Sequence, residues 1–303
     1  MDIRRLIVNL GKLLVCGIVF FVGTQIGGAA ASLVGLQAAP MAPGANRNLS
    51  LLHSLLLSPL LAFALACLAR DLAGSFVARA SILSFLAWIA YAVCDQLEGL
   101  LVSTYSTGFW FAVVESLVAS LLCGGAVAWL FPPAQGGRSL GAASRAFFSG
   151  RRAGAWLWRI AVAAVAFVPI YFIIGLLVLP FVRHAYEQNL YGLQEPAVDR
   201  LLAILLVRSV LFATACLPVL IAWQGTKRSL FFRLGVALFL LVAWPSIFTA
   251  YWLPWSLRVP HTLEILADEF IYSGVLVALL TKKASAGCAK LMICPRHGMI
   301  EPT

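Results

Sequence analysis

Residues 258–280 read RVPHTLEILADEFIYSGVLVALL, an apolar stretch that carries one polar stripe. His261, Glu264, Asp268 and Tyr272 follow one another at steps of three, four and four residues, so a helix places all four on a single face. An ionisable side chain costs about 2.5–3.5 kcal/mol at the middle of a bilayer. The stripe therefore predicts that this helix belongs to a bundle, whose interior or water-filled recess receives the polar face.

The rest of the chain is apolar as well. Of its 303 residues, 62% are hydrophobic and 11% are charged, with a mean hydropathy of +0.94, whereas a soluble domain averages about 25% charged residues. Long apolar runs recur along the chain, and about 20 apolar residues suffice to cross the hydrocarbon of a bilayer. We therefore predict an all-α, polytopic transmembrane bundle, a multi-pass membrane protein whose first partner is the lipid bilayer.

The apolar runs divide the chain into about eight predicted spans, separated by loops rich in Pro, Gly, Asn and basic residues. Pro260 is expected to begin the last span, because a proline at the first helical position gives up an N–H that would be unpaired anyway. Pro245 is expected to kink or break the seventh span. The predicted spans are residues 6–36, 51–69, 80–102, 109–131, 156–182, 201–223, 230–252 and 261–281.

Basic residues lie mostly on one side of this arrangement. With eight spans both termini share a side, and 16 of the 22 Lys and Arg residues fall in the loops of that side, against four on the other. Cytoplasmic loops are enriched in Lys and Arg, so we expect both termini in the cytoplasm and the protein in the plasma (inner) membrane. The same pattern accounts for the net charge of +10, and we expect no nucleic-acid partner.

The predicted spans form two similar halves. Residues 64–68 (ALACL) match residues 213–217 (ATACL) at an offset of 149, and Glu115 and Glu264 are separated by the same 149 residues. A parallel repeat of four spans plus four would explain this, whereas the alternative is coincidence between Leu- and Ala-rich helices. The expected divisions are a first half 1–133, a basic cytoplasmic linker 134–155, a second half 156–283 and a cytoplasmic tail 284–303.

Six acids lie within the predicted spans, and with this topology all six fall in the outer half of the membrane, at the depth of Arg208 and His261. One hypothesis is a water-accessible cavity that opens to the outside and is lined by spans three, four, six and eight. The other is a set of ion pairs that joins the helices. Because arginine keeps its proton, we expect Arg208 to pair with Glu115, Glu264 or Asp268. The six acids are Asp95, Glu98, Glu115, Glu264, Asp268 and Glu269.

The sequence leaves three functions open. It contains no phosphate-binding loop, no His-Glu-x-x-His motif and no Gly-x-Ser-x-Gly motif. The favoured function is a transporter or permease for a small solute, coupled to a proton or small cation that the carboxylates carry. One alternative is an intramembrane enzyme, in which His261, Glu264 and Asp268 provide acid–base or metal-assisted hydrolysis. The other is a non-catalytic scaffold or assembly subunit. We expect no cofactor and no bound metal ion.

Overall fold

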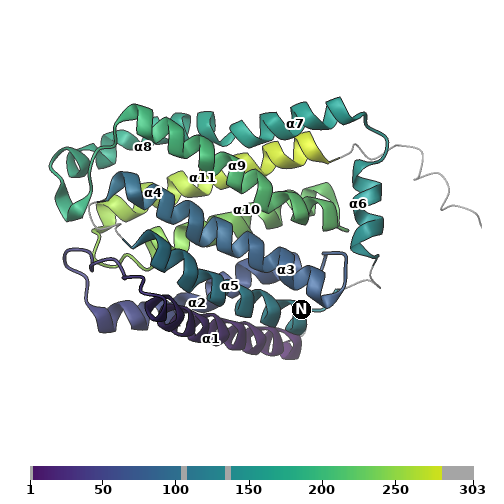
Figure 1. The fold of residues 1–303 in the computed structure, drawn as a ribbon, viewed down its shortest axis with the longest axis horizontal. Coiled ribbons are helices and arrows are strands. Elements are labelled where there is room, and N and C mark those ends of the chain that lie inside the picture. The colour runs from purple at the N-terminus through teal and green to yellow at the C-terminus, as the bar shows by residue number, and fades with distance from the viewer. Residues whose placement is uncertain (1–2, 104–107, 134–137, 282–303) are drawn as a thin grey trace, which may run out of the picture.

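The computed structural model describes residues 3–103, 108–133 and 138–281. Helices make up 82% of the structure, and no strand occurs in the described ranges. Most of the helices run along one long axis, so the chain forms a bundle with its loops at the two ends (Figure 1). The predicted all-α class is confirmed.

Six helical segments are long and apolar enough to cross a membrane. They coincide with the first six predicted spans, and they fit an integral, multi-pass membrane protein. Asn46 caps the second of them, because its side-chain oxygen accepts a hydrogen bond from the Asn48 N–H at 2.9 Å, as expected at a helix start. The six segments are α1 (Ile3–Leu33), α2 (Arg47–Ala69), the run from α3 to α4 (Phe76–Val102), α5 (Phe109–Leu130), the run from α7 to α8 (Ala153–Glu187) and α9 (Val198–Ala222).

The last two predicted spans differ from these six. α10 (Lys227–Ala243) continues as a π-helical turn, η3 (Trp244–Phe248), so its α-helical part is shorter than the roughly 20 residues of a typical span. α11 (Trp255–Leu280) is long enough but carries three acids. Both helices nevertheless lie within the same bundle (Figure 1). The total of eight spans therefore stays a prediction.

The prediction that the last helix begins at Pro260 is wrong. α11 begins at Trp255, and the N–H groups of Leu257 and Arg258 donate to the Pro254 carbonyl at 3.0 and 3.1 Å. The Pro254 carbonyl thus starts the helix before Pro260 is reached. A proline so close to the N-terminus removes only one of the early backbone hydrogen bonds.

The third predicted span contains a π-helical turn. It consists of α3 (Phe76–Ala87), η1 (Trp88–Val93) and α4 (Cys94–Val102). A π-helical turn holds one residue more than an α-helical turn, so α4 is rotated about its axis relative to an uninterrupted helix. The rotated α4 packs against α9.

The fifth predicted span, expected as one helix over 156–182, is broken in two. α7 (Ala153–Val165) and α8 (Phe167–Glu187) are separated by one residue. Pro169 explains the break, because it has no N–H to donate to the Val165 carbonyl and its ring collides with that group. The Phe167 N–H is bound instead by Ser209 Oγ of α9 at 3.3 Å. After the break the chain changes neighbours, since α7 packs mainly on α9 whereas α8 packs mainly on α11.

α1 and α5 pack closely because α1 carries glycines where the two helices meet. A Cβ on Gly23 would lie 2.7 Å from Ala119 Cα, and a Cβ on Gly27 would lie 2.3 Å from the Glu115 carbonyl oxygen. Small residues of this kind let the backbones of membrane helices approach each other. α1 is also one continuous helix.

The start of α1 and the end of α11 lie at the same end of the bundle (Figure 1), and the sequence places many basic residues in the helix termini and loops of this end. Several of them bind carbonyl groups at helix C-termini: Lys12 Nζ donates to Leu130 O at 2.9 Å, and Arg79 Nη2 donates to Ala128 O at 2.7 Å. Such carbonyls carry partial negative charge from the helix dipole. The basic residues that predict the orientation of the protein therefore also stabilise helix ends, and the orientation itself stays a prediction.

Two short helices complete the structure. α6 (Leu140–Phe148) lies in the predicted basic linker, and the 3₁₀ turn η2 (Leu190–Gly192) lies in the loop between α8 and α9. The predicted tail, 284–303, is outside the described residues.

Candidate functional site

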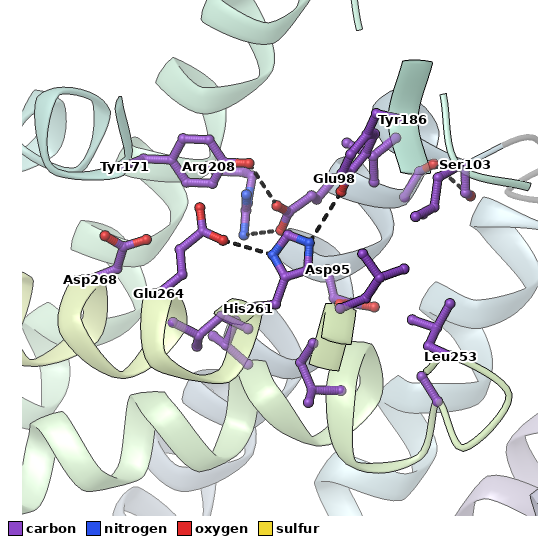
Figure 2. A pocket seen from close by; sticks show the side chains of 18 of the residues that line it. Asp95, Glu98, Ser103, Tyr171, Tyr186, Arg208, Leu253, His261, Glu264 and Asp268 are labelled. Carbon is purple, nitrogen blue, oxygen red and sulfur yellow. Dashed lines mark hydrogen bonds and ion pairs between the residues drawn. The ribbon is translucent and has the colours of Figure 1, made fainter. Parts of the chain in front are cut away.

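One cavity collects most of the polar side chains predicted to form a site. It has a volume of about 190 Å³ and is lined by α4, α8, α9 and α11, near the loops at the end of the bundle opposite to the start of α1 (Figures 1 and 2). A cavity of this size holds several water molecules or a small polar group. Seven of the eight predicted residues line it: Asp95, Glu98, Arg208, His261, Glu264, Asp268 and Glu269.

Arg208 forms the central ion pair of this cavity, with Glu98. Arg208 Nη2 lies 2.8 Å from Glu98 Oε2, and Glu98 Oε1 accepts a hydrogen bond from the Tyr171 hydroxyl at 3.0 Å (Figure 2). The prediction that Arg208 pairs with Glu115, Glu264 or Asp268 is therefore wrong. The reason is the π-helical turn before α4, which rotates the face bearing Glu98 toward α9.

Aromatic rings surround the buried guanidinium. Arg208 is 2% exposed, and its Cζ lies 5.7 Å from the ring centroid of Phe167, 5.9 Å from that of Phe212 and 6.0 Å from that of Tyr171. These distances fit cation–π contacts, which help to stabilise a charge away from water. Arg208 is thus fixed by one carboxylate and three rings, and among the described residues it forms an ion pair with Glu98 only.

His261 and Glu264 form a second polar pair within α11. His261 Nδ1 lies 2.7 Å from Glu264 Oε2, and His261 Nε2 lies 3.5 Å from the Tyr186 hydroxyl of α8 (Figure 2). The stripe that the sequence places on one face of this helix thus points inward: Glu264 is 8% exposed, and Asp268 and Tyr272 are 3% and 0% exposed. The Tyr272 hydroxyl donates to backbone carbonyls of α7 and α9, so it holds the helix in place and does not enter the cavity.

Three carboxyl groups of the cavity have no ion-pair partner among the described residues: Asp95, Asp268 and Glu269. Asp268 and Glu269 are 3% and 1% exposed. Asp268 Oδ1 and Glu269 Oε2 also accept no hydrogen bond from the part of the chain that the structure describes. An isolated carboxylate is costly to bury, so Asp268 and Glu269 each require a proton or a bound cation.

Glu115 is the predicted residue that lies elsewhere. It is half-buried on α5 and faces α1, where its Oε1 lies 3.5 Å from the position that a Cβ on Gly28 would take. The expectation that all the acids share one cavity is therefore wrong for Glu115. The close packing of α1 on α5 explains this, because the glycines of α1 hold the side chain of Glu115 between the two helices.

Comparison with known proteins does not assign the site. No family model, no curated protein and no solved structure matches this chain. The chemistry of the site is therefore inferred from the side chains that line it.

Sequence reasoning missed two tyrosines of the site, Tyr171 and Tyr186. Both lie on α8 and line the cavity. They share one face of that helix with Gly175 and Val182, at steps of four, seven and four residues, which follow the helical repeat. The sequence contains one signal for these residues: a helical face that begins and ends with tyrosine and has a glycine between the two.

The arrangement can perform two kinds of chemistry. The carboxyl groups of Asp95, Asp268 and Glu269 can take up and release protons or bind a cation, since none of them has an ion-pair partner among the described residues. His261, oriented by Glu264, can move a proton between its ring and a group in the cavity. Within the ranges that the structure describes, no three His, Cys, Asp or Glu side chains are grouped so that they could hold one metal ion.

Proposed function

We propose that this protein is an inner-membrane transporter that couples movement of a small solute to a proton or small cation bound by its cavity. One observation carries the proposal: Asp95, Asp268 and Glu269 lie inside a membrane bundle with no ion-pair partner among the described residues. Ionisable side chains at such places mark ion and substrate paths in membrane proteins. A purely structural network would be expected to pair each acid with a base.

We propose eight spans with both termini in the cytoplasm. Support comes from α10 and α11, which lie within the bundle formed by the six longer apolar helices. Further support comes from the basic residues at the end where α1 begins, which is the distribution expected of a cytoplasmic face. In this orientation the cavity lies in the outer half of the membrane, next to the outer loops that contain Leu193 and Leu253.

Helix packing supports a repeat of four spans plus four. In each half the first span packs on the second and the fourth, and the third packs on the fourth. Between the halves, α2 packs on α10, and α9 packs on the run from α3 to α4, so the second span of each half meets the third span of the other. These reciprocal contacts fit two parallel repeats related by an axis along the membrane normal. The proposed halves are 1–133 and 156–283, joined by the linker 134–155.

The loops between the second and third spans of each half also support the repeat. The Ala73 N–H donates to Ala222 O at 2.7 Å, and the Gln224 N–H donates to Asp71 O at 2.8 Å. These two bonds form an antiparallel bridge between the loops. Two equivalent loops meet in this way when a twofold axis passes between them.

Proteoliposomes with a pH-sensitive dye inside test the proposed ion coupling. A gradient of Na⁺ or of K⁺ is imposed, and the change in internal pH is recorded with valinomycin present in the sodium experiments to remove the membrane potential. We expect flux with the wild-type protein, a loss of about tenfold or more in Asp268→Asn and in Glu269→Gln, and flux unchanged in Glu115→Gln. The loss reflects removal of a charged hydrogen-bonding group. Absence of flux in folded wild-type protein under every gradient would falsify the proposal.

A second function, an intramembrane hydrolase, is favoured by one observation. His261 is oriented by Glu264 at 2.7 Å, as a general base is oriented by a neighbouring carboxylate. This candidate predicts that His261→Gln destroys activity whereas Asp95→Asn leaves it largely intact. A transporter that uses its unpaired acids predicts the opposite ranking of the two variants in the flux measurement.

A further inference from the structure

A second hollow adjoins the polar cavity and has a different character. It is a cleft of about 470 Å³ between α8 and α9, within the range of about 300–1,000 Å³ typical of sites for small organic ligands. Leu176 and Val198 on its walls are 65% and 66% exposed, so the cleft lies at the surface of the bundle, where a membrane protein meets lipid chains. Its apolar walls consist of Phe172, Leu176, Val178, Leu179, Val182, Val198 and Leu201.

The cleft and the cavity share one boundary. Tyr171, Tyr186, His261 and Glu264 line both of them, and Figure 2 shows Tyr186, His261 and Glu264 converging from α8 and α11. Gly175 faces this boundary, because a Cβ built on it would lie 3.2 Å from Glu264 Oε1. A glycine there leaves room beside the carboxyl group. An apolar chain in the cleft would therefore end at Glu264, with a polar group directed into the cavity.

The charged side chains of the cavity determine which polar group can be bound at the end of such a chain. Arg208 is paired with Glu98 and His261 with Glu264, which leaves Asp95, Asp268 and Glu269 without an ion-pair partner in the part of the chain that the structure describes. A cationic group is favoured beside these acids, and an anionic group is repelled. A primary ammonium brings three N–H donors, and the buried oxygens Asp268 Oδ1 and Glu269 Oε2 lack donors among the described residues.

We propose that the cleft and cavity together bind an amphiphile with one aliphatic chain and a primary ammonium head. The chain lies between α8 and α9, and the head passes Glu264 to reach Asp268 and Glu269. The molecule enters sideways from the outer leaflet through the exposed cleft. This inference names the solute class of the proposed transporter and so rests on that function, but binding is measured independently of ion flux.

Photo-crosslinking tests the inference directly. The probe is dodecylamine with a diazirine at the middle of its chain, added to the purified protein in phosphatidylcholine nanodiscs. The same chain with an alcohol head and with a carboxylate head provides the comparison. We expect the amine to label α8 and α9 at the cleft, with about tenfold less labelling by the alcohol, as befits loss of charged hydrogen bonds, and less still by the carboxylate. Unlabelled dodecylamine should compete.

Two sets of variants locate the head and the chain. Asp268→Asn with Glu269→Gln should remove the preference for the amine, whereas Glu115→Gln, the matched acid outside the cavity, should keep it. Leu176→Trp should fill the cleft and reduce labelling by every probe, whereas Leu121→Trp, on the exposed face of α5 (54% exposed), should not. Labelling spread evenly over the lipid-facing helices, or equal for the three heads, overturns the inference. Flux without amine-selective labelling rejects the inference alone, and selective labelling without flux rejects the proposed transporter alone.

Discussion

The surroundings of Glu115 and Glu264 differ although the two acids lie on helices, α5 and α11, that correspond in the proposed repeat. Glu115 faces an unbroken α1, whose Gly27 and Gly28 bring the two backbones together. Glu264 faces α8, which is the second piece of a helix broken before Phe167, and it has a histidine partner, a cavity on one side and a cleft on the other. The acid alone does not create a site. The difference indicates that the space around Glu264 results from the break between α7 and α8.

Removal of the Arg208 side chain should reduce the amount of folded protein more than any of the other changes proposed below. Arg208→Leu leaves Glu98 buried without its base, and breaking one side of a buried ion pair costs about 3–5 kcal/mol. We expect most of the folded protein to be lost, as measured by the monodisperse peak in size-exclusion chromatography and by thermal unfolding.

Combination with Glu98→Gln should recover part of that loss, because neither charge then remains unpaired. Combination with Glu115→Gln should recover nothing, since Glu115 lies against α1 and outside the cavity that holds the pair. Equal recovery by both double variants would show that Glu98 is not the partner of Arg208.

Glycine replacements measure how tightly each acid is enclosed. Gly27→Ala puts a Cβ 2.3 Å from a backbone oxygen of α5, whereas Gly175→Ala puts one 3.2 Å from the end of a side chain that can move. Overpacking against backbone costs about 1–3 kcal/mol. The midpoint temperature of thermal unfolding should therefore fall clearly in Gly27→Ala and by much less in Gly175→Ala. A reversed order would contradict the tighter enclosure of Glu115 than of Glu264.

Thiol labelling should give a smaller but more local difference. Glu264→Cys and Glu115→Cys are prepared in a background without the native cysteines, which are free in the described structure, and a membrane-impermeant maleimide is added outside. We expect the cysteine at position 264 to react faster, because this position lines a cavity near the outer loops, whereas position 115 packs against α1. Reaction at 264 only from the cytoplasmic side would reverse the proposed orientation, and equal rates would remove the distinction between the halves.

Much of the fold follows from the sequence because hydrophobicity and helical spacing act locally. The long apolar runs predict the six helices that can cross a membrane, and the spacing of His261, Glu264 and Asp268 predicts the inward face of α11. Both predictions depend on one helix at a time. They need no knowledge of which helices become neighbours.

The partners across helices could not be predicted in the same way. Glu98 reaches Arg208 only because η1 rotates α4 toward α9, and no local spacing reports a π-helical turn. Glu115 lies outside the cavity because α1 is its neighbour, which depends on the packing of the whole bundle. Tyr171 and Tyr186 enter the site through the break before α8, and although Pro169 marks that break, the direction of the helix after it depends on tertiary contacts.

The bridge between the loops at residues 71–73 and 222–224 has a consequence for which substitutions the protein tolerates. Its two hydrogen bonds, Ala73 N–H to Ala222 O and Gln224 N–H to Asp71 O, use only main-chain atoms. Side chains at these positions can therefore change without breaking the bonds. Proline at 73 or 224 is the exception, because it removes a donor. The two loops can thus diverge in sequence and stay joined through the main chain, in addition to the helix contacts between the halves.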